Sequence, residues 1–308
     1  MNAARLGLGL AAVGRPAYIT TARDADLGEP ARRSIDAMRA RAHELLDEAW
    51  ALGIRYVDTA RSYGYAERFL GSWLATHPER RGAITIGSKW GYEYVGAWRM
   101  DAEVHERKDH SAAMFDRQWP ETLDALSTVP DLYLVHSVTP DSPVLADAEV
   151  MARLRALGER GVTVGLSTSG PHQGEVVRAA IALADSPFGA VQATWNLRES
   201  TVGDALAAAR DAGWTVVLKE VLANGELARA APEGDLERAA SGIAPDVFAI
   251  GAARAQPFAD IVLVGATTRE HLRTAVSASA RPIGRAVRDA LAVDPVSYWR
   301  ERSARPWS

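Results

Sequence analysis

Residues 35–58 read IDAMRARAHELLDEAWALGIRYVD, and this stretch shows the unit from which the chain is built. Apolar side chains recur at helical spacing from Ile35 to Leu52, which predicts a helix. Gly53 follows at the position where the end of a helix favours a left-handed residue. The next run, Ile54–Asp58, is apolar without strict alternation, as in a strand that is covered on both faces. The stretch therefore predicts a helix followed directly by a buried parallel strand.

The same alternation of apolar runs and helical patterns continues along the whole chain. Eight runs are expected to form strands: Leu6–Leu10, Ile54–Asp58, Ala83–Ser88, Leu132–His136, Val162–Ser167, Ala190–Thr194, Trp214–Lys219 and Ile261–Val264. Helical patterns lie between them, for example at Ile35–Leu52, Ala66–Ala75, Met114–Leu126, Leu145–Gly158, Gly174–Ala184 and Val202–Ala212. Eight strand–helix units favour an α/β fold of the closed (β/α)8 TIM barrel type. An open doubly wound sheet is the alternative, although no run leads into the G-x-G-x-x-G turn typical of that fold.

No Ser/Gly-rich linker or shift in composition divides the 308 residues, and 47% of them are hydrophobic, enough for a large core. We expect one barrel domain over residues 1–308, with an appended helix and tail from about residue 283. Three stretches that follow predicted strands are too long for simple connections and are expected to line the active face. They are Gly14–Ala31, Trp90–His110 and Glu220–Gly242.

Charge and cysteine content narrow the range of partners. The net charge is −4 and there is no basic stripe interleaved with aromatics, so nucleic acid is not an expected partner. The absence of cysteine excludes disulfides and a cysteine nucleophile, and it fits a reducing cytoplasm, where we expect the protein. The run Leu6–Val13 is too short to span a membrane, and residues 1–14 do not read as a secretory signal. A small molecule is the expected partner, and the sequence does not fix the oligomeric state.

Four polar residues stand at the ends of successive apolar runs or just after them. Asp58, Lys89 and His136 close three predicted strands, and Tyr63 follows Asp58 in the next loop. Strand ends meet at one mouth of a parallel barrel, so these side chains are expected to form one site. A free phenol titrates near ~10, and a neighbouring ammonium lowers that value. With a carboxylate to anchor the lysine and a histidine to orient a substrate oxygen, the set suits general acid/base chemistry at a carbonyl that gains a hydride.

The motifs that carry these residues resemble the aldo-keto reductase superfamily. They are GIRYVDTARSYG at residues 53–64, Ser88-Lys89, and Leu134-Val135-His136. The resemblance extends over nearly the whole chain and implies a nicotinamide-dependent oxidoreductase acting on an aldehyde, a ketone or a sugar-like alcohol. It implies that Tyr63 is the general acid/base, that Lys89 and Asp58 tune it, and that His136 binds the substrate carbonyl.

The resemblance also assigns the nicotinamide end of a cofactor site. Ser167 and Gln192 match positions that hold the carboxamide, and Thr168 stands where the family usually has asparagine. Trp195 stands where the family usually stacks a tyrosine on the nicotinamide ring. The loop from Val221 to Leu227 is similar to the segment that lies over the pyrophosphate, with Leu222, Gly225 and Leu227 as its candidate contacts.

The adenosine end departs from the family pattern. The segment Gly265–Leu272, which includes Thr267, resembles the stretch that binds the adenosine phosphate. Gly265, Ala266 and His271 replace the Lys, Ser and Arg of many NADPH-preferring members. Arg269, or else Arg273, is left to meet a 2′-phosphate, because a guanidinium binds phosphate in a bidentate way. We expect NADP from the family habit, with NAD possible, and Arg269 as the phosphate contact.

Several alternatives stay open at this level. A barrel that binds the cofactor but barely turns over would serve regulation, and a barrel aldolase would use Lys89 as a Schiff-base nucleophile. Trp195 could pack in the core instead of stacking on a cofactor. His105 and His110 lie among acidic residues, but a polar loop explains them better than a metal, and no metal is expected.

Overall fold

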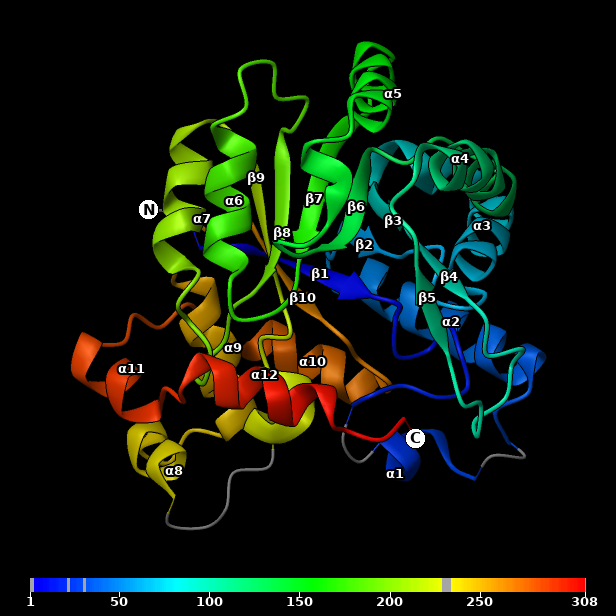
Figure 1. The fold of residues 1–308 in the computed structure, drawn as a ribbon. Coiled ribbons are helices and arrows are strands. Elements are labelled where there is room, and N and C mark those ends of the chain that lie inside the picture. The colour runs from blue at the N-terminus through cyan, green and yellow to red at the C-terminus, as the bar shows by residue number, and fades with distance from the viewer. Residues whose placement is uncertain (1–2, 21–22, 30–31, 229–233, 308) are drawn as a thin grey trace.

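The structure is a computed structural model that describes residues 3–20, 23–29, 32–228 and 234–307. Within these residues, eight parallel strands close into a barrel in the order β1-β10-β9-β8-β7-β6-β3-β2 (Figure 1). Their bounds are β1 Arg5–Gly9, β2 Tyr56–Asp58, β3 Thr85–Trp90, β6 Leu132–Val138, β7 Thr163–Thr168, β8 Ala190–Thr194, β9 Thr215–Lys219 and β10 Ile261–Val264. The predicted (β/α)8 barrel and its eight strands are confirmed, and the open doubly wound sheet is ruled out.

Each barrel strand is followed by a helix on the outside. These helices are α2 Ile35–Ala51, α3 Ala66–Thr76, α4 Ala112–Leu126, α5 Ala148–Glu159, α6 Gln173–Ile181, α7 Gly203–Asp211, α9 Pro245–Arg254 and α10 Arg269–Ser277. Helix α2 begins where the Ser34 hydroxyl accepts a hydrogen bond from the amide of Ala37, and it is followed by Gly53 at a φ of 82°. Several predicted boundaries are shifted by one to three residues. The helix predicted from Leu145 starts at Ala148, because the Asp147 carboxylate caps the amides of Glu149 and Val150.

The interior of the barrel explains why the polar strand ends meet. Residues two apart on a strand point to the same side, and the side chains of Tyr56, Leu134 and Val217 form an apolar cluster inside the barrel. Gly87 leaves room for one of them, since a Cβ there would lie 2.4 Å from the Tyr56 hydroxyl. Two residues beyond Tyr56, Leu134 and Val217, the same inward side carries Asp58, His136 and Lys219 at the carboxyl ends of these strands.

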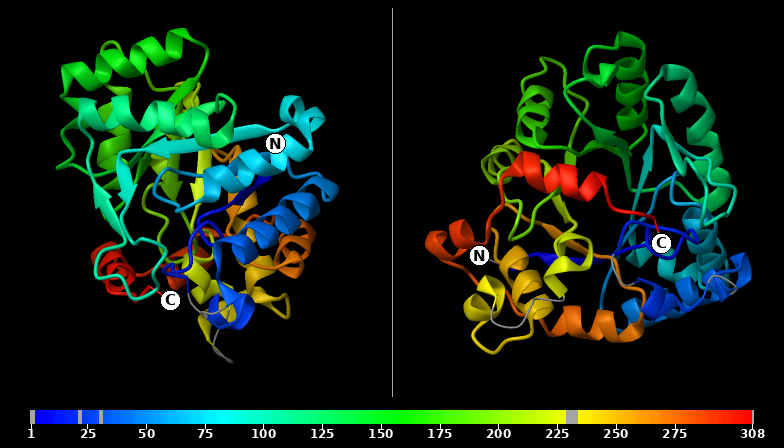
Figure 2. Two further views of the ribbon diagram at one scale, coloured as in Figure 1. Left: turned by 90° about the vertical axis from the view of Figure 1, so that its right-hand side faces the viewer. Right: turned by 60° about the horizontal axis from the view of Figure 1, so that its bottom comes forward.

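Shorter elements cover that end of the barrel. They are the helices α1 Arg23–Leu27, α8 Asp235–Ala240, α11 Arg285–Leu291 and α12 Pro295–Ser303, the 3₁₀ turns Pro143–Leu145 and Ala223–Ala228, and an antiparallel hairpin of β4 Tyr92–Tyr94 with β5 Glu106–Lys108. A further 3₁₀ turn, Pro78–Ala83, leads from α3 into β3 at the opposite end of the barrel. Figure 2 shows α12 leading the C-terminal stretch across to the N-terminal segment. The rings of Trp307 and Tyr18 are in edge-on contact there, with centroids 6.1 Å apart. No helix among the described residues is both long and apolar enough to cross a membrane.

Candidate active site

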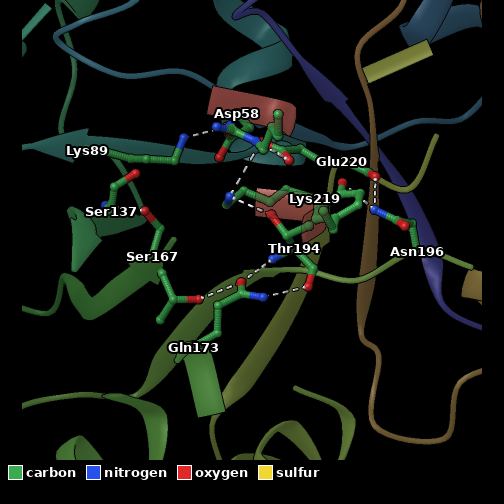
Figure 3. A network of polar contacts seen from close by, with 12 residues as sticks. Asp58, Lys89, Ser137, Ser167, Gln173, Thr194, Asn196, Lys219 and Glu220 are labelled. Atoms are coloured by element: carbon green, nitrogen blue, oxygen red, sulfur yellow. Dashed lines mark hydrogen bonds and ion pairs between the residues drawn. The ribbon is translucent and has the colours of Figure 1, made fainter. Parts of the chain in front are cut away.

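A buried ion pair forms the base of the site. The Lys89 ammonium donates to Asp58 Oδ1 at 2.5 Å and to the carbonyl of Thr59 at 2.9 Å (Figure 3). The amide Nε2 of Gln192 donates to the other carboxylate oxygen of Asp58 at 2.7 Å. Lys89 is 0% exposed and Asp58 is 2% exposed. Strands β2, β3 and β8 thus bring together three of the residues expected from the sequence, and both oxygens of Asp58 are engaged.

Tyr63 lies over this pair on the wall of a cavity. The Lys89 ammonium is 4.8 Å from the centre of the Tyr63 ring, and the Arg15 guanidinium is 5.2 Å from it. Burial, with the nearby Asp58 carboxylate, raises the pKa of Tyr63 well above 10 despite the opposing charge of Arg15. The Lys89 ammonium is paired with Asp58 and lies against the face of the ring, so its charge does not offset the effect of burial. The phenol is protonated at neutral pH and can act as an acid.

His136 faces the same cavity beside Tyr63. The two rings meet edge to face with centroids 5.5 Å apart, and Nδ1 of His136 lies 3.3 Å from the Ser62 hydroxyl. Burial, followed by the positive charges of Lys89, Lys219 and Arg15, lowers the pKa of His136 well below 6.5. A neutral imidazole remains, and the tautomer that accepts from Ser62 carries its proton on Nε2.

The cavity has a volume of about 580 Å³ and reaches well beyond the catalytic candidates. It is lined by residues from all three of the long stretches singled out in the sequence, such as Arg15, Glu106 and Val221. Of the residues proposed to bind a cofactor, six line it: Gln192, Leu222, Gly225, Gly265, Thr267 and His271. The predicted site residues of β2, β6, β8 and β10 are therefore brought to one connected space.

The other proposed cofactor residues are not among those that line the cavity. Ser167 accepts from the amide of Ser137 at 2.8 Å, and Thr168 donates to Gln173 at 3.1 Å. Leu227 is buried, and Arg269 is exposed at the start of α10. Ser167 and Thr168 are thus hydrogen-bonded within the protein, and Arg269 is exposed to solvent.

Trp195 is packed in the core and not on the cavity wall. It follows directly after β8 and is not among the residues that line the cavity, whereas Gln192 is. It is 1% exposed and packs edge-on against Phe258, with ring centres 6.4 Å apart. This placement favours the core-packing interpretation over stacking on a cofactor.

Sequence reasoning missed a second set of charged groups in the cavity. Lys219 ends β9 on the inward side, donates to the Thr194 hydroxyl at 2.8 Å and lies 3.7 Å from Glu220 (Figure 3). Burial lowers the pKa of Lys219 to about 8. Although burial opposes it, the charges of Arg302 and Lys219 lower the pKa of Glu220 to about 2. Lys219 was detectable from the sequence, because it closes its strand as Lys89 closes β3.

The cavity mouth joins three distant segments. Arg15 is 1% exposed and donates to Glu106 at 2.6 Å and to the carbonyl of Ser62 at 2.8 Å. Trp307 lies 4.5 Å from the Arg15 guanidinium and stacks on His105 at 4.3 Å. His110 instead lies within 2.8 Å of the His136 carbonyl oxygen. In the part of the chain that the structure describes, no three His, Asp or Glu side chains form a candidate metal site.

Comparison with known proteins identifies the family. A model of the aldo/keto reductase family matches residues 29–241, so the chain belongs to that family. It is an NAD(P)-dependent oxidoreductase of the TIM-barrel type. Among curated proteins, none matches the chain significantly.

Solved structures share the fold over most of the chain. An aldo-keto reductase from Bacillus halodurans in its holo form is 21% identical, over 94% of this chain and 91% of that one, with a TM-score of 0.68. The glycerol dehydrogenase of Gluconobacter oxydans is 20% identical, over 99% and 92%, with a TM-score of 0.68. A protein from Pseudomonas aeruginosa, described as an aldo-keto reductase, is 26% identical over 90% of both chains, with a TM-score of 0.65.

Proposed function

We propose that this oxidoreductase transfers a hydride between NAD(P) and a small carbonyl/alcohol pair, an aldehyde, a ketone or a sugar-like alcohol, with Tyr63 as the general acid/base. The observation that carries the proposal is the meeting of Tyr63 and His136 on one cavity wall above the buried Lys89–Asp58 pair. The pair holds the floor of the site rigid, because both Asp58 oxygens and the Lys89 ammonium are bonded to the protein.

The protein's own groups account for the proton and the orientation of the substrate. A neutral His136 donates from Nε2 to the carbonyl oxygen and holds it beside the Tyr63 hydroxyl. Tyr63 is protonated at neutral pH, so it gives its proton to that oxygen in the reductive direction. A bound nicotinamide supplies or accepts the hydride.

The residues present fit such a cofactor. The buried Oε1 of Gln192 has no hydrogen-bond partner among the described residues, while its Nε2 is fixed by Asp58. An unsatisfied buried acceptor is costly, and a carboxamide N–H would satisfy it. Gln192 would hold the nicotinamide amide, Leu222 and Gly225 the phosphates, and Gly265, Thr267 and His271 the adenosine end. Arg269 is exposed and lies outside the cavity lining, so it does not support a preference for NADP over NAD.

The geometry does not favour a Lys89 aldolase. A Schiff base needs a free amine that a substrate can reach. Lys89 is fully buried behind Tyr63, and its ammonium is bonded to a carboxylate and a carbonyl.

The test is turnover, followed through the absorbance of the reduced nicotinamide with a panel of aldehydes, ketones and sugars. Tyr63→Phe should lower kcat at least about a hundredfold and leave cofactor binding unchanged, because only the proton donor is lost. Tyr65→Phe is the matched control, since this neighbouring ring packs on Trp98 instead of lining the cavity, and it should retain full activity. A Tyr63→Phe enzyme with most of its turnover would refute the role of Tyr63. A protein that binds cofactor and turns over none of the panel would favour a regulatory barrel.

A further inference from the structure

The far end of the cavity is lined by a carboxylate, Asp26, that belongs to no motif of the sequence. From Tyr63 the cavity extends along Leu222 and Gly225 to the turn between β10 and α10, where Thr267 and Asp26 line it. Asp26 belongs to α1, and its Oδ2 accepts from the Thr267 hydroxyl at 2.7 Å. A dinucleotide with its nicotinamide beside Tyr63 must place its other half toward this end, because the cavity continues there.

The contact between α1 and this turn is held by the backbone as well. Nη1 of Arg41 donates to the carbonyl of Asp26 at 3.3 Å and to the carbonyl of Thr267 at 3.2 Å. The Thr267 hydroxyl also lies 3.2 Å from Nδ1 of His271. Asp26 is therefore fixed in place at the cavity wall by two hydrogen-bonded links to the turn.

The cations expected to meet a 2′-phosphate are elsewhere. Arg269 is exposed and outside the cavity lining, and Arg273 is bound through two nitrogens to Glu48, at 2.7 and 3.3 Å. Among the described residues that line this end, His271 is the one basic side chain. Gly265 contributes no side chain where many NADPH-preferring relatives have lysine.

We propose that Asp26 selects NAD over NADP, an inference that rests on the proposed function of the cavity. A ribose 2′-hydroxyl can donate to a carboxylate, and an acidic residue serves this purpose in other NAD sites. A 2′-phosphate carries up to two negative charges and would be repelled by the Asp26 carboxylate. The preference runs against the NADP expected from the sequence resemblance.

The experiment compares the dissociation constants of NADH and NADPH, measured by quenching of tryptophan fluorescence. The wild-type protein should bind NADH at least about tenfold more tightly than NADPH, the effect of one unfavourable charge contact. Asp26→Asn keeps the size of the side chain and an oxygen for Thr267 but removes the charge, so it should reduce this ratio about tenfold, mainly by tightening NADPH. Glu29→Gln, an exposed acidic residue near α1, is the control and should leave the ratio unchanged.

Two results would overturn the inference. A wild-type protein that binds NADPH as tightly as NADH would show that the Asp26 carboxylate does not exclude the 2′-phosphate. An unchanged ratio in Asp26→Asn would remove Asp26 from cofactor choice. Both results leave the proposed function intact. Failure of the wild-type protein to bind either cofactor would instead contradict the proposed function itself.

Discussion

Replacing Asp58 with alanine should destabilise the fold as well as abolish turnover. Lys89 is fully buried and is bonded to Asp58 at 2.5 Å, so the substitution leaves an ammonium without its carboxylate. The amide of Gln192 loses its acceptor at the same time. Removing one partner of a buried ion pair costs about 3–5 kcal/mol, much more than the net value of an intact pair.

This cost can be converted into a shift in Tm. Unfolding of a 308-residue chain has an entropy of about 0.65 kcal/mol/K at the usual value per residue. A loss of about 3–5 kcal/mol therefore lowers Tm by roughly 5–8 °C. Differential scanning calorimetry of the wild-type protein and of Asp58→Ala measures this shift directly.

Two further variants separate the buried charge from other effects. Asp116→Ala breaks an exposed pair in which Arg153 donates through two nitrogens at 2.8 Å, and it should change Tm by about 1 °C or less. The double variant Asp58→Ala/Lys89→Met removes the stranded ammonium and should recover most of the lost stability. An Asp58→Ala protein that melts within about 1 °C of the wild type would refute the reasoning.

Two other predictions concern residues away from the catalytic pair. Trp195→Ala should lower the free energy of unfolding by about 3–5 kcal/mol, because the ring packs in the core. The dissociation constant of the cofactor should stay within about twofold of the wild-type value. Weaker cofactor binding at an unchanged Tm would instead support stacking of Trp195 on the cofactor. Burial lowers the pKa of His110 to about 4, although its hydrogen bond to the His136 carbonyl opposes the shift. Below about pH 6.5, His110 is protonated in the unfolded chain but stays neutral in the folded protein. Its contribution should therefore lower the free energy of unfolding by about 2–3 kcal/mol as the pH falls toward about 4. His110→Gln should lose less stability than the wild type between pH 7 and pH 4.5 in urea unfolding, and equal losses would contradict the assignment.

Strand periodicity was sufficient to place the core of the site. Asp58, Lys89 and His136 close apolar runs, and parallel strands in a barrel must bring such ends together. The same rule would have found Lys219, which is the last residue of β9. For these residues, the position at the end of a strand is enough to predict that the side chain faces the mouth of the barrel.

The remaining features could not be predicted because they depend on contacts between distant loops. The pairs Arg15–Glu106 and Asp26–Thr267 join segments with no shared periodicity, and nothing in either local sequence specifies the partner. The raised pKa of Tyr63 could not be predicted for the same reason, since it depends first on how deeply the ring is buried and then on the charges of Asp58 and of the distant residues Arg15 and Glu106. Sequence spacing gives the neighbours of a group but not its desolvation.

The mouth of the cavity also constrains the order in which the protein can fold. Arg15 and Glu106 are 91 residues apart in the chain, and Arg302 and Glu220 are 82 apart. Closing loops of this length costs entropy that is repaid only when the intervening barrel already holds the ends near each other. We therefore expect the wall that includes Trp307 to form after the barrel strands have paired, so that a partly folded barrel would have catalytic strand ends but no enclosed place for a ligand. On this reasoning, the ability to bind a ligand is the last property that folding produces.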